Sequence, residues 1–145
     1  MPSSEVQSPE KEKPSKSGGE TVLVVEDNLD VCELTLQRLK RLGYKTIVAN
    51  SGSAAIAALG NDNNIDLVFT DVVMAGGMSG VDVAQWVRTN RPRAKILLTS
   101  GYAELADDDA FAELGIKILR KPYKLADLGR AIEEALQAEG RSREG

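Results

Sequence analysis

Three acidic side chains of this 145-residue chain follow apolar runs that are typical of buried β-strands. Glu26 and Asp27 come directly after "TVLVV", and Asp71 comes directly after "DLVFT". Adjacent carboxylates at the end of a buried strand repel each other and lose hydration, so they need a nearby positive charge or access to water. Whether these carboxylates have a positive charge beside them or reach water depends on the groups that the fold brings close to them.

Two further strand-like runs also end in polar groups. Thr99 and Ser100 follow "KILL", and Lys121 follows "KILR". The chain therefore offers three carboxylates, two hydroxyls and one ammonium at the ends of apolar runs.

The elements that would position these groups alternate along the chain. Strand-like segments are 21–26, 45–49, 65–70, 95–100 and 116–120. Helix-like segments are 29–42, 53–59, 80–90, 104–114 and 124–138. Strict alternation predicts an α/β fold, a doubly wound parallel sheet with helices on both faces. Such sheets bind ligands at the carboxyl ends of their strands, where the polar groups above would meet.

Gathered at one edge, these groups suit phosphoryl transfer. Carboxylate oxygens suit Mg²⁺, which takes one or two protein carboxylates together with waters and phosphate oxygens. A lysine and a hydroxyl can bind phosphoryl oxygens, and a carboxylate can act as the nucleophile.

Five motifs in register resemble the receiver domains of two-component response regulators: "LVVEDN", "DLVFTDVVM", "GMSG", "LLTSGY" and "LRKPY". The resemblance implies a flavodoxin-like (βα)5 fold with strand order 2-1-3-4-5 and a receiver domain over residues 20–140. We expect residues 1–19 to form a disordered tail or linker, because they hold few aliphatic residues, and residues 141–145 to fray. The resemblance most closely fits the C-terminal receiver of a bacterial hybrid histidine kinase.

The resemblance implies a role for each acidic residue. Asp71 is expected to be the phospho-acceptor. Asp27 is expected to bind Mg²⁺ directly and Glu26 through water, with Asp71 and the backbone carbonyl of Val73 completing the protein ligands. Taken alone, Asp27 could instead cap the helix that follows it.

The resemblance also implies roles for the basic and hydroxyl groups. Lys121 is expected to contact the phosphoryl group, and its bond to Pro122 is expected to be cis. Ser100 is expected to be the hydroxyl that moves toward the phosphoryl group on activation. Ser100 is chosen over Thr99 because it immediately precedes the loop that begins at Gly101, which would leave Thr99 on the other face of the strand.

Two positions depart from the family pattern. Ala75 stands where relatives have proline, four residues after the acceptor, and Ile118 stands where they have an aromatic switch residue. Tyr102 and Tyr123 are the nearby aromatic side chains that could replace it.

Composition excludes several classes of function. The chain has no histidine, which excludes Ser-His-Asp and histidine–zinc chemistry. A net charge of −4 argues against nucleic-acid binding. Cys32 is the single cysteine and lies on the apolar stripe of its helix, which indicates a core position and a reducing, cytoplasmic setting. No apolar run is long enough to predict a membrane span.

The leading hypothesis is a phosphorylation-controlled switch, not a turnover enzyme. It would take a phosphoryl group from a histidine kinase or histidine phosphotransfer protein, in a Mg²⁺-dependent step, and alter the surface formed by 104–138, through which it could also form a homodimer. A stand-alone single-domain response regulator is the alternative to the hybrid kinase. A phosphatase of the haloacid-dehalogenase type is a distant alternative, because such enzymes need an acid where Val73 stands. A docking module that works without phosphorylation is the third hypothesis.

Overall fold

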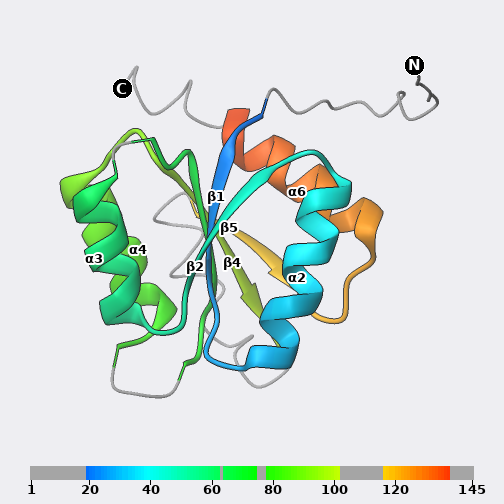
Figure 1. The fold of residues 1–145 in the computed structure, drawn as a ribbon, viewed down its shortest axis with the longest axis horizontal. Helices are drawn as coiled ribbons and strands as arrows, with labels where there is room; N and C mark the ends of the chain where they lie inside the picture. The colour runs from blue at the N-terminus through cyan, green and yellow to red at the C-terminus, as the bar shows by residue number, and fades with distance from the viewer. Residues whose placement is uncertain (1–18, 63, 75–77, 102–115, 138–145) are drawn as a thin grey trace.

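The computed structural model describes residues 19–62, 64–74, 78–101 and 116–137. They form a five-stranded sheet with helices on both faces (Figure 1). The strands are β1 (Thr21–Val25), β2 (Lys45–Ala49), β3 (Leu67–Asp71), β4 (Lys95–Ser100) and β5 (Lys117–Arg120). The helices are α2 (Leu29–Arg41), α3 (Gly52–Asn61), α4 (Gly80–Asn90) and α6 (Leu125–Gln137).

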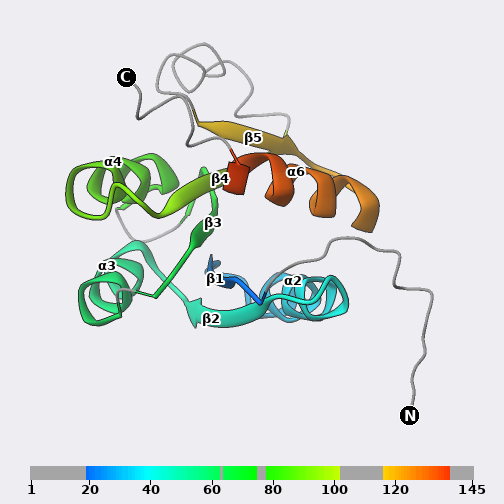
Figure 2. The same ribbon diagram turned by 90° about the horizontal axis from the view of Figure 1, so that it is seen from above.

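All neighbouring strands are parallel, in the order β2-β1-β3-β4-β5. The order can be followed across the sheet in Figure 2. This confirms the predicted doubly wound fold. The winding reverses at β1, which pairs with β2 on one side and with β3 on the other, so the carboxyl ends of β1 and β3 define the place where such a fold binds ligands.

The two faces of the sheet are covered by different helices, α3 and α4 on one side and α2 and α6 on the other (Figures 1 and 2). The α3/α4 face buries a cluster that includes Leu23, Val25, Val68 and Leu98. The α2/α6 face buries a second cluster that includes Val24, Phe69, Leu97 and Leu128. Successive strand residues thus contribute to opposite cores, which explains why the strands are nearly continuously apolar in sequence.

Local sequence signals account for the helix ends near the site. The side chain of Asn28 accepts a hydrogen bond from the backbone N–H of Val31 and is the N-cap of α2. The cap role considered for Asp27 therefore belongs to its neighbour. After α2, Gly43 has a φ of 95°, a left-handed conformation that favours glycine.

Most predicted element positions agree with the structure. Helix 80–90 has the predicted bounds, and α3 is longer than predicted, since it runs from Gly52 to Asn61. Cys32 is buried, as expected, and Trp86 is half-buried against the α3/α4 core. Several expected features lie outside the described residues. They are helix 104–114, residues 1–18 of the tail, the frayed end 141–145, and the positions of Ala75 and Tyr102. Among the described helices, none is both long and apolar enough to cross a membrane.

Candidate functional site

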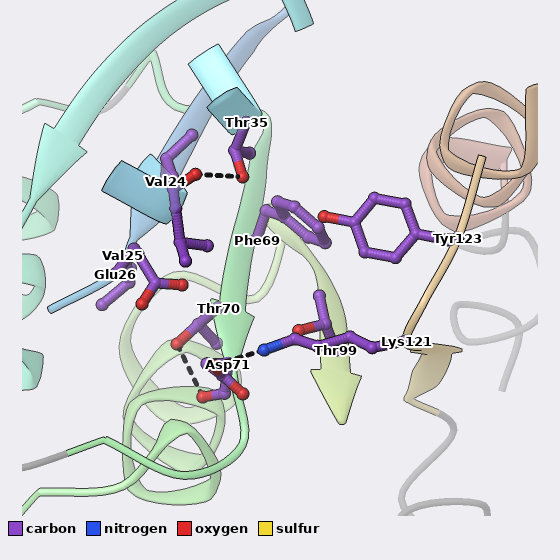
Figure 3. Close-up of a pocket in the computed structure, with 11 residues that line it drawn as sticks. Val24, Val25, Glu26, Thr35, Phe69, Thr70, Asp71, Thr99, Lys121 and Tyr123 are labelled. Carbon is purple, nitrogen blue, oxygen red and sulfur yellow. Dashed lines mark hydrogen bonds and ion pairs between the residues drawn. The ribbon is translucent and has the colours of Figure 1, made fainter. Parts of the chain in front are cut away.

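Asp71 and Lys121, fifty positions apart in the chain, meet at the carboxyl edge of the sheet. The Lys121 Nζ donates a hydrogen bond of 2.8 Å to Asp71 Oδ2, and the contact is also an ion pair (Figure 3). Asp71 is the last residue of β3, and Lys121 directly follows β5. The expected convergence of the acidic and basic strand ends is thus present for this pair.

Strand geometry decides which side chains share the site. Side chains two residues apart on a strand lie on the same face of the sheet. On the α2/α6 face this gives four pairs of a core residue and a polar residue at the strand end, namely Val24 and Glu26, Phe69 and Asp71, Leu97 and Thr99, and Leu119 and Lys121. Sheet hydrogen bonding continues to the end of this series, because the Lys121 N–H donates to Ser100 O at 2.9 Å.

The two hydroxyls at the end of β4 have different surroundings. Thr99 is in register with Asp71 across β3 and β4, and it lines the pocket that also contains Asp71 and Lys121. Ser100 is the next residue along β4, so its side chain belongs to the opposite face, the face of Leu98. Its Oγ is fully buried and has no hydrogen-bond partner among the described residues. Ser100, the residue that the sequence favoured, thus does not line the pocket, and its expected movement toward the phosphoryl group on activation stays a prediction.

Glu26 is buried, with 8% of its surface exposed, and lines the same pocket (Figure 3). Its Oε2 accepts a hydrogen bond of 3.1 Å from the Asn28 N–H. Burial raises the pKa of Glu26, and the negative charges of Asp71 and Asp27 raise it further, against the lowering effects of the Asn28 hydrogen bond and the Lys121 ammonium. An additional cation would therefore stabilise the ionised form of Glu26.

Lys121 is held as a cation beside these acids. Burial acts to lower its pKa, but the hydrogen bond from Lys121 to Asp71 and the negative charges of Asp71 and Glu26 together raise the pKa above its ordinary value. The Lys121 side chain is 36% exposed and the Asp71 side chain 13% exposed, so the pair remains accessible to solvent. An anion approaching from solvent would meet a fixed positive charge there.

Two expected residues, Asp27 and Val73, are not among the described residues that line the pocket. Asp27 is exposed, and Val73 has 57% of its surface exposed. Leu29, the first residue of α2, is 71% exposed.

The backbone behind Asp71 is packed against the start of α4. The N–H of Gly80 donates to Val72 O at 2.9 Å, and a Cβ at Gly80 would lie 2.9 Å from the Asp71 carbonyl carbon and closer still to its oxygen. Ser79 caps the helix through a reciprocal pair of hydrogen bonds with Asp82. In the sequence, Gly80 is the last residue of the "GMSG" motif. The close approach that requires glycine arises from packing between a strand and a helix, and no local pattern reveals it.

The loop after Lys121 adds an aromatic wall to the pocket. The Lys121–Pro122 bond is cis, as expected. The Tyr123 ring packs edge-to-face on Phe69, with centroids 6.4 Å apart, and Arg38 of α2 lies over the same ring at 5.4 Å. Ile118 packs against the α3/α4 core. Tyr123 is therefore on the opposite face of the sheet from Ile118 and does not take the place of an aromatic side chain there.

The donor set fits Mg²⁺. Carboxylates at the ends of β1 and β3 supply hard oxygen ligands, and burial, with the charges of Asp71 and Asp27 as smaller contributions, raises the pKa of Glu26, so that a bound cation would stabilise its ionised form. Within the described ranges, no group of three or more His, Cys, Asp or Glu side chains is arranged to hold a metal by itself. Mg²⁺ does not need such a cage, because it keeps several waters and takes one or two protein carboxylates.

Comparisons with known proteins agree with this geometry. Residues 22–133 match the family model of the response regulator receiver domain. The chain is 31% identical over 118 residues to the response regulator receiver protein CpdR of Brucella abortus (strain 2308), covering 81% of this chain and 97% of that protein. It is 34% identical over 127 residues to the sensor kinase CckA of the same organism, covering 83% of this chain but only 13% of that protein.

A solved structure also resembles the fold. The response regulator receiver protein from Sinorhizobium medicae WSM419 superimposes with a TM-score of 0.73 at 29% identity, over 83% of this chain and 97% of that one.

Proposed function

The chain belongs to the response regulator receiver domain family, and on that premise we propose that Asp71 accepts a phosphoryl group from a phosphohistidine. An oxygen of the Asp71 carboxylate attacks phosphorus, the phosphorus–nitrogen bond breaks, and its electron pair returns to the imidazole of the donor. The chain acts as a switch in two-component signalling, and slow hydrolysis of the aspartyl phosphate resets it.

The observation that carries this proposal is the contact between Lys121 Nζ and Asp71 Oδ2. The ammonium already lies where an oxygen of the incoming phosphoryl group would develop negative charge. A fixed cation at that position neutralises charge without reorganisation during the reaction.

Mg²⁺ would be held by the Asp71 and Asp27 carboxylates, by Glu26 through water, and by the backbone carbonyl of Val73. When bound, the ion supplies charge neutralisation for the phosphoryl oxygens and relieves the repulsion among the three acids. The burial of Glu26 and its raised pKa support this assignment.

Thr99 is a second candidate for the hydroxyl role, beside Ser100. Thr99 lines the pocket and is in register with Asp71, so its hydroxyl can donate to a phosphoryl oxygen on that carboxylate. Ser100 would take the role by moving toward the pocket on activation, as the resemblance implies.

The proposed donor is a histidine kinase or a histidine phosphotransfer protein, which implies a cytoplasmic setting. Two arrangements of the whole protein are supported by different relatives. The receiver of a hybrid histidine kinase, our preferred arrangement, fits the identity to sensor kinase CckA, and a stand-alone regulator fits the nearly full coverage of CpdR. Immunoblotting of source cells with an antibody against this domain distinguishes them by the size of the polypeptide.

Intact-mass spectrometry tests the proposed function. With Mg²⁺ and a small phosphodonor, the chain should gain the mass of one phosphoryl group, and hydroxylamine, which cleaves acyl phosphates, should remove it. Asp71→Asn should abolish the gain. Asp66→Asn is a matched control, since Asp66 precedes the same strand at its far end, where it accepts a hydrogen bond from the Thr21 N–H. A hydroxylamine-resistant phosphate on Ser or Thr would contradict the proposal.

The same experiment separates the remaining alternatives. A phosphatase of the haloacid-dehalogenase type would hydrolyse ordinary phosphoesters over many turnovers, and Val73 in place of the required acid argues against it. A docking module that works without phosphorylation would neither bind Mg²⁺ nor take up the phosphoryl group.

A further inference from the structure

Tyr123 contacts residues of two elements, Phe69 of the acceptor strand β3 and Arg38 of helix α2. Its ring meets Phe69 of β3 edge-to-face, with an angle of 69° between the ring planes, and the Arg38 guanidinium of α2 lies over it. Figure 3 shows the Tyr123 and Phe69 side chains close together, on the same side of the strand as Asp71 and Lys121. The described hydrogen bonds and ion pairs of the site do not account for this stack, which has no direct contact with the reacting carboxylate.

The stack and the ion pair form two parallel connections between the same two segments. Phe69 and Asp71 are two residues apart on β3, and Tyr123 and Lys121 are two residues apart in the segment that follows β5. Phe69 holds Tyr123, and Asp71 holds Lys121. Movement of the Tyr123 ring would therefore shift the backbone that carries the Lys121 side chain.

Arg38 closes the outer side of the stack. It lies in the last turn of α2, next to Leu39, which is fully buried in the α2/α6 core. That anchor fixes the backbone from which the guanidinium reaches the ring. A cation over the face of tyrosine and an aromatic edge on its other contact are both favourable arrangements.

We propose that Tyr123 is a positioning residue for Lys121 and that Arg38 holds Tyr123 in that role. The inference rests on the proposed function, because it concerns the ammonium that receives the phosphoryl group. Because Arg38 lies on α2 and contacts the Tyr123 ring, the position of the Lys121 ammonium would depend on this helix. The acidic residues of the site lie in the loop before α2 and at the end of β3, and not on α2 itself.

The test compares labelling rates with a small phosphodonor and Mg²⁺. Tyr123→Leu keeps apolar volume but removes both ring contacts, and it should slow labelling of Asp71 by about three- to ten-fold, the factor that corresponds to the usual energy of one aromatic contact. Tyr123→Phe keeps the ring and should label at close to the wild-type rate. Tyr44→Leu is the matched control, because Tyr44 is a buried aromatic residue of the same core and is not among the described residues that line the site pocket. It should lower stability without changing the labelling rate of the folded protein.

A second comparison tests the part played by Arg38. Arg38→Gln should slow labelling by about two- to five-fold, the factor expected from an exposed cation–π contact, and Arg38→Lys should restore part of the rate. Arg41→Gln removes an exposed cation from the same last turn of α2 and should have no effect.

A double-mutant cycle distinguishes positioning from a general effect on folding. If Tyr123 acts through the ammonium, Tyr123→Leu should have no further effect in the Lys121→Gln background. Equal slowing in both backgrounds, or a wild-type rate for Tyr123→Leu, would overturn the inference while leaving the proposed function intact. Absence of labelling in the wild-type chain would instead contradict the proposed function itself.

Discussion

Replacement of Gly80 by alanine tests how tightly the acceptor strand is held. A Cβ at Gly80 would lie 2.9 Å from the carbonyl carbon of Asp71 and 3.0 Å from Val72 Cα. Carbon atoms in contact are normally about 3.5–4.0 Å apart, so the strand end and the helix start must separate. Both partners are backbone, and no rotamer change relieves the contact.

The cost of Gly80→Ala should reach the upper end for overpacking, about 3 kcal/mol. With a urea m-value of about 1–3 kcal/mol/M, the unfolding midpoint should fall by roughly 1–3 M. Trp86, the single tryptophan, lies on α4 and reports unfolding by fluorescence. Labelling of Asp71 should also slow in the folded protein, because the displaced carbonyl belongs to the acceptor residue.

Two other glycines provide graded controls. A Cβ at Gly60 in α3 meets nothing within 4 Å, so Gly60→Ala should stabilise the protein by about 0.5 kcal/mol through helix propensity. A Cβ at Gly129 in α6 meets the flexible Leu42 side chain at 3.1 Å, and Gly129→Ala should be nearly neutral. If Gly80→Ala unfolds at the same urea concentration as Gly60→Ala, the packing argument is wrong.

Further predictions concern the hydroxyls, an exposed leucine and a buried tyrosine. Thr99→Ala should slow labelling about ten-fold or more if Thr99 supplies the hydroxyl, through the loss of one hydrogen bond to a charged group. Ser100→Ala should then label normally and gain about 1 kcal/mol in stability, because it removes a buried hydroxyl that has no hydrogen-bond partner among the described residues. The reverse pattern of rates would assign the role to Ser100. Leu29→Ala should slow transfer from a phosphohistidine protein but not labelling by a small phosphodonor, since Leu29 is 71% exposed at the start of α2, shortly after the acidic pair. Val48→Ala, an exposed apolar change on β2, should alter neither rate. Equal slowing with both donors would exclude a docking role for Leu29. Burial raises the pKa of Tyr44 to about 12. Above pH 10 the unfolded chain loses this proton first, so the free energy of unfolding should fall by roughly 2 kcal/mol between pH 10 and 12. In urea titrations Tyr44→Phe should lack that part of the fall, and the same pH dependence of stability in the variant and the wild type would contradict the reasoning.

The fold could be predicted because its signals are local. Alternating apolar runs and helical stripes gave the five strands and their parallel arrangement, and the acidic and basic strand ends indicated which edge carries the site. Asp71 and Lys121 were found because both directly end a strand. Asp27 was a reasonable cap from sequence, but the side chain that accepts the bond is that of Asn28.

The choice between Thr99 and Ser100 depends on two sequence signals that favour different residues. The position of Ser100 directly before the loop favours Ser100. Counting by two from core residues places Thr99 with Leu97, on the same face as Asp71 with Phe69. Alternation of faces describes the resting strand, because moving one residue to the other face would move the whole strand. The expected role of Ser100 requires a movement on activation, which no local sequence signal predicts, so the labelling rates of the two alanine variants decide between them.

Other features depend on contacts between distant segments and could not be predicted. The stack of Arg38, Tyr123 and Phe69 joins residues far apart in the chain, and no spacing rule connects them. The backbone contact at Gly80 is of the same kind.

The location of the phosphoryl group tests the central claim most directly. After labelling with a small phosphodonor and Mg²⁺, borohydride reduction converts an aspartyl phosphate to homoserine, which tandem mass spectrometry of peptides can locate. The account predicts homoserine at position 71 alone, its loss when Mg²⁺ is chelated, and its slower formation when Lys121 is replaced by glutamine. Homoserine at another aspartate, or equal labelling without Mg²⁺, would contradict it.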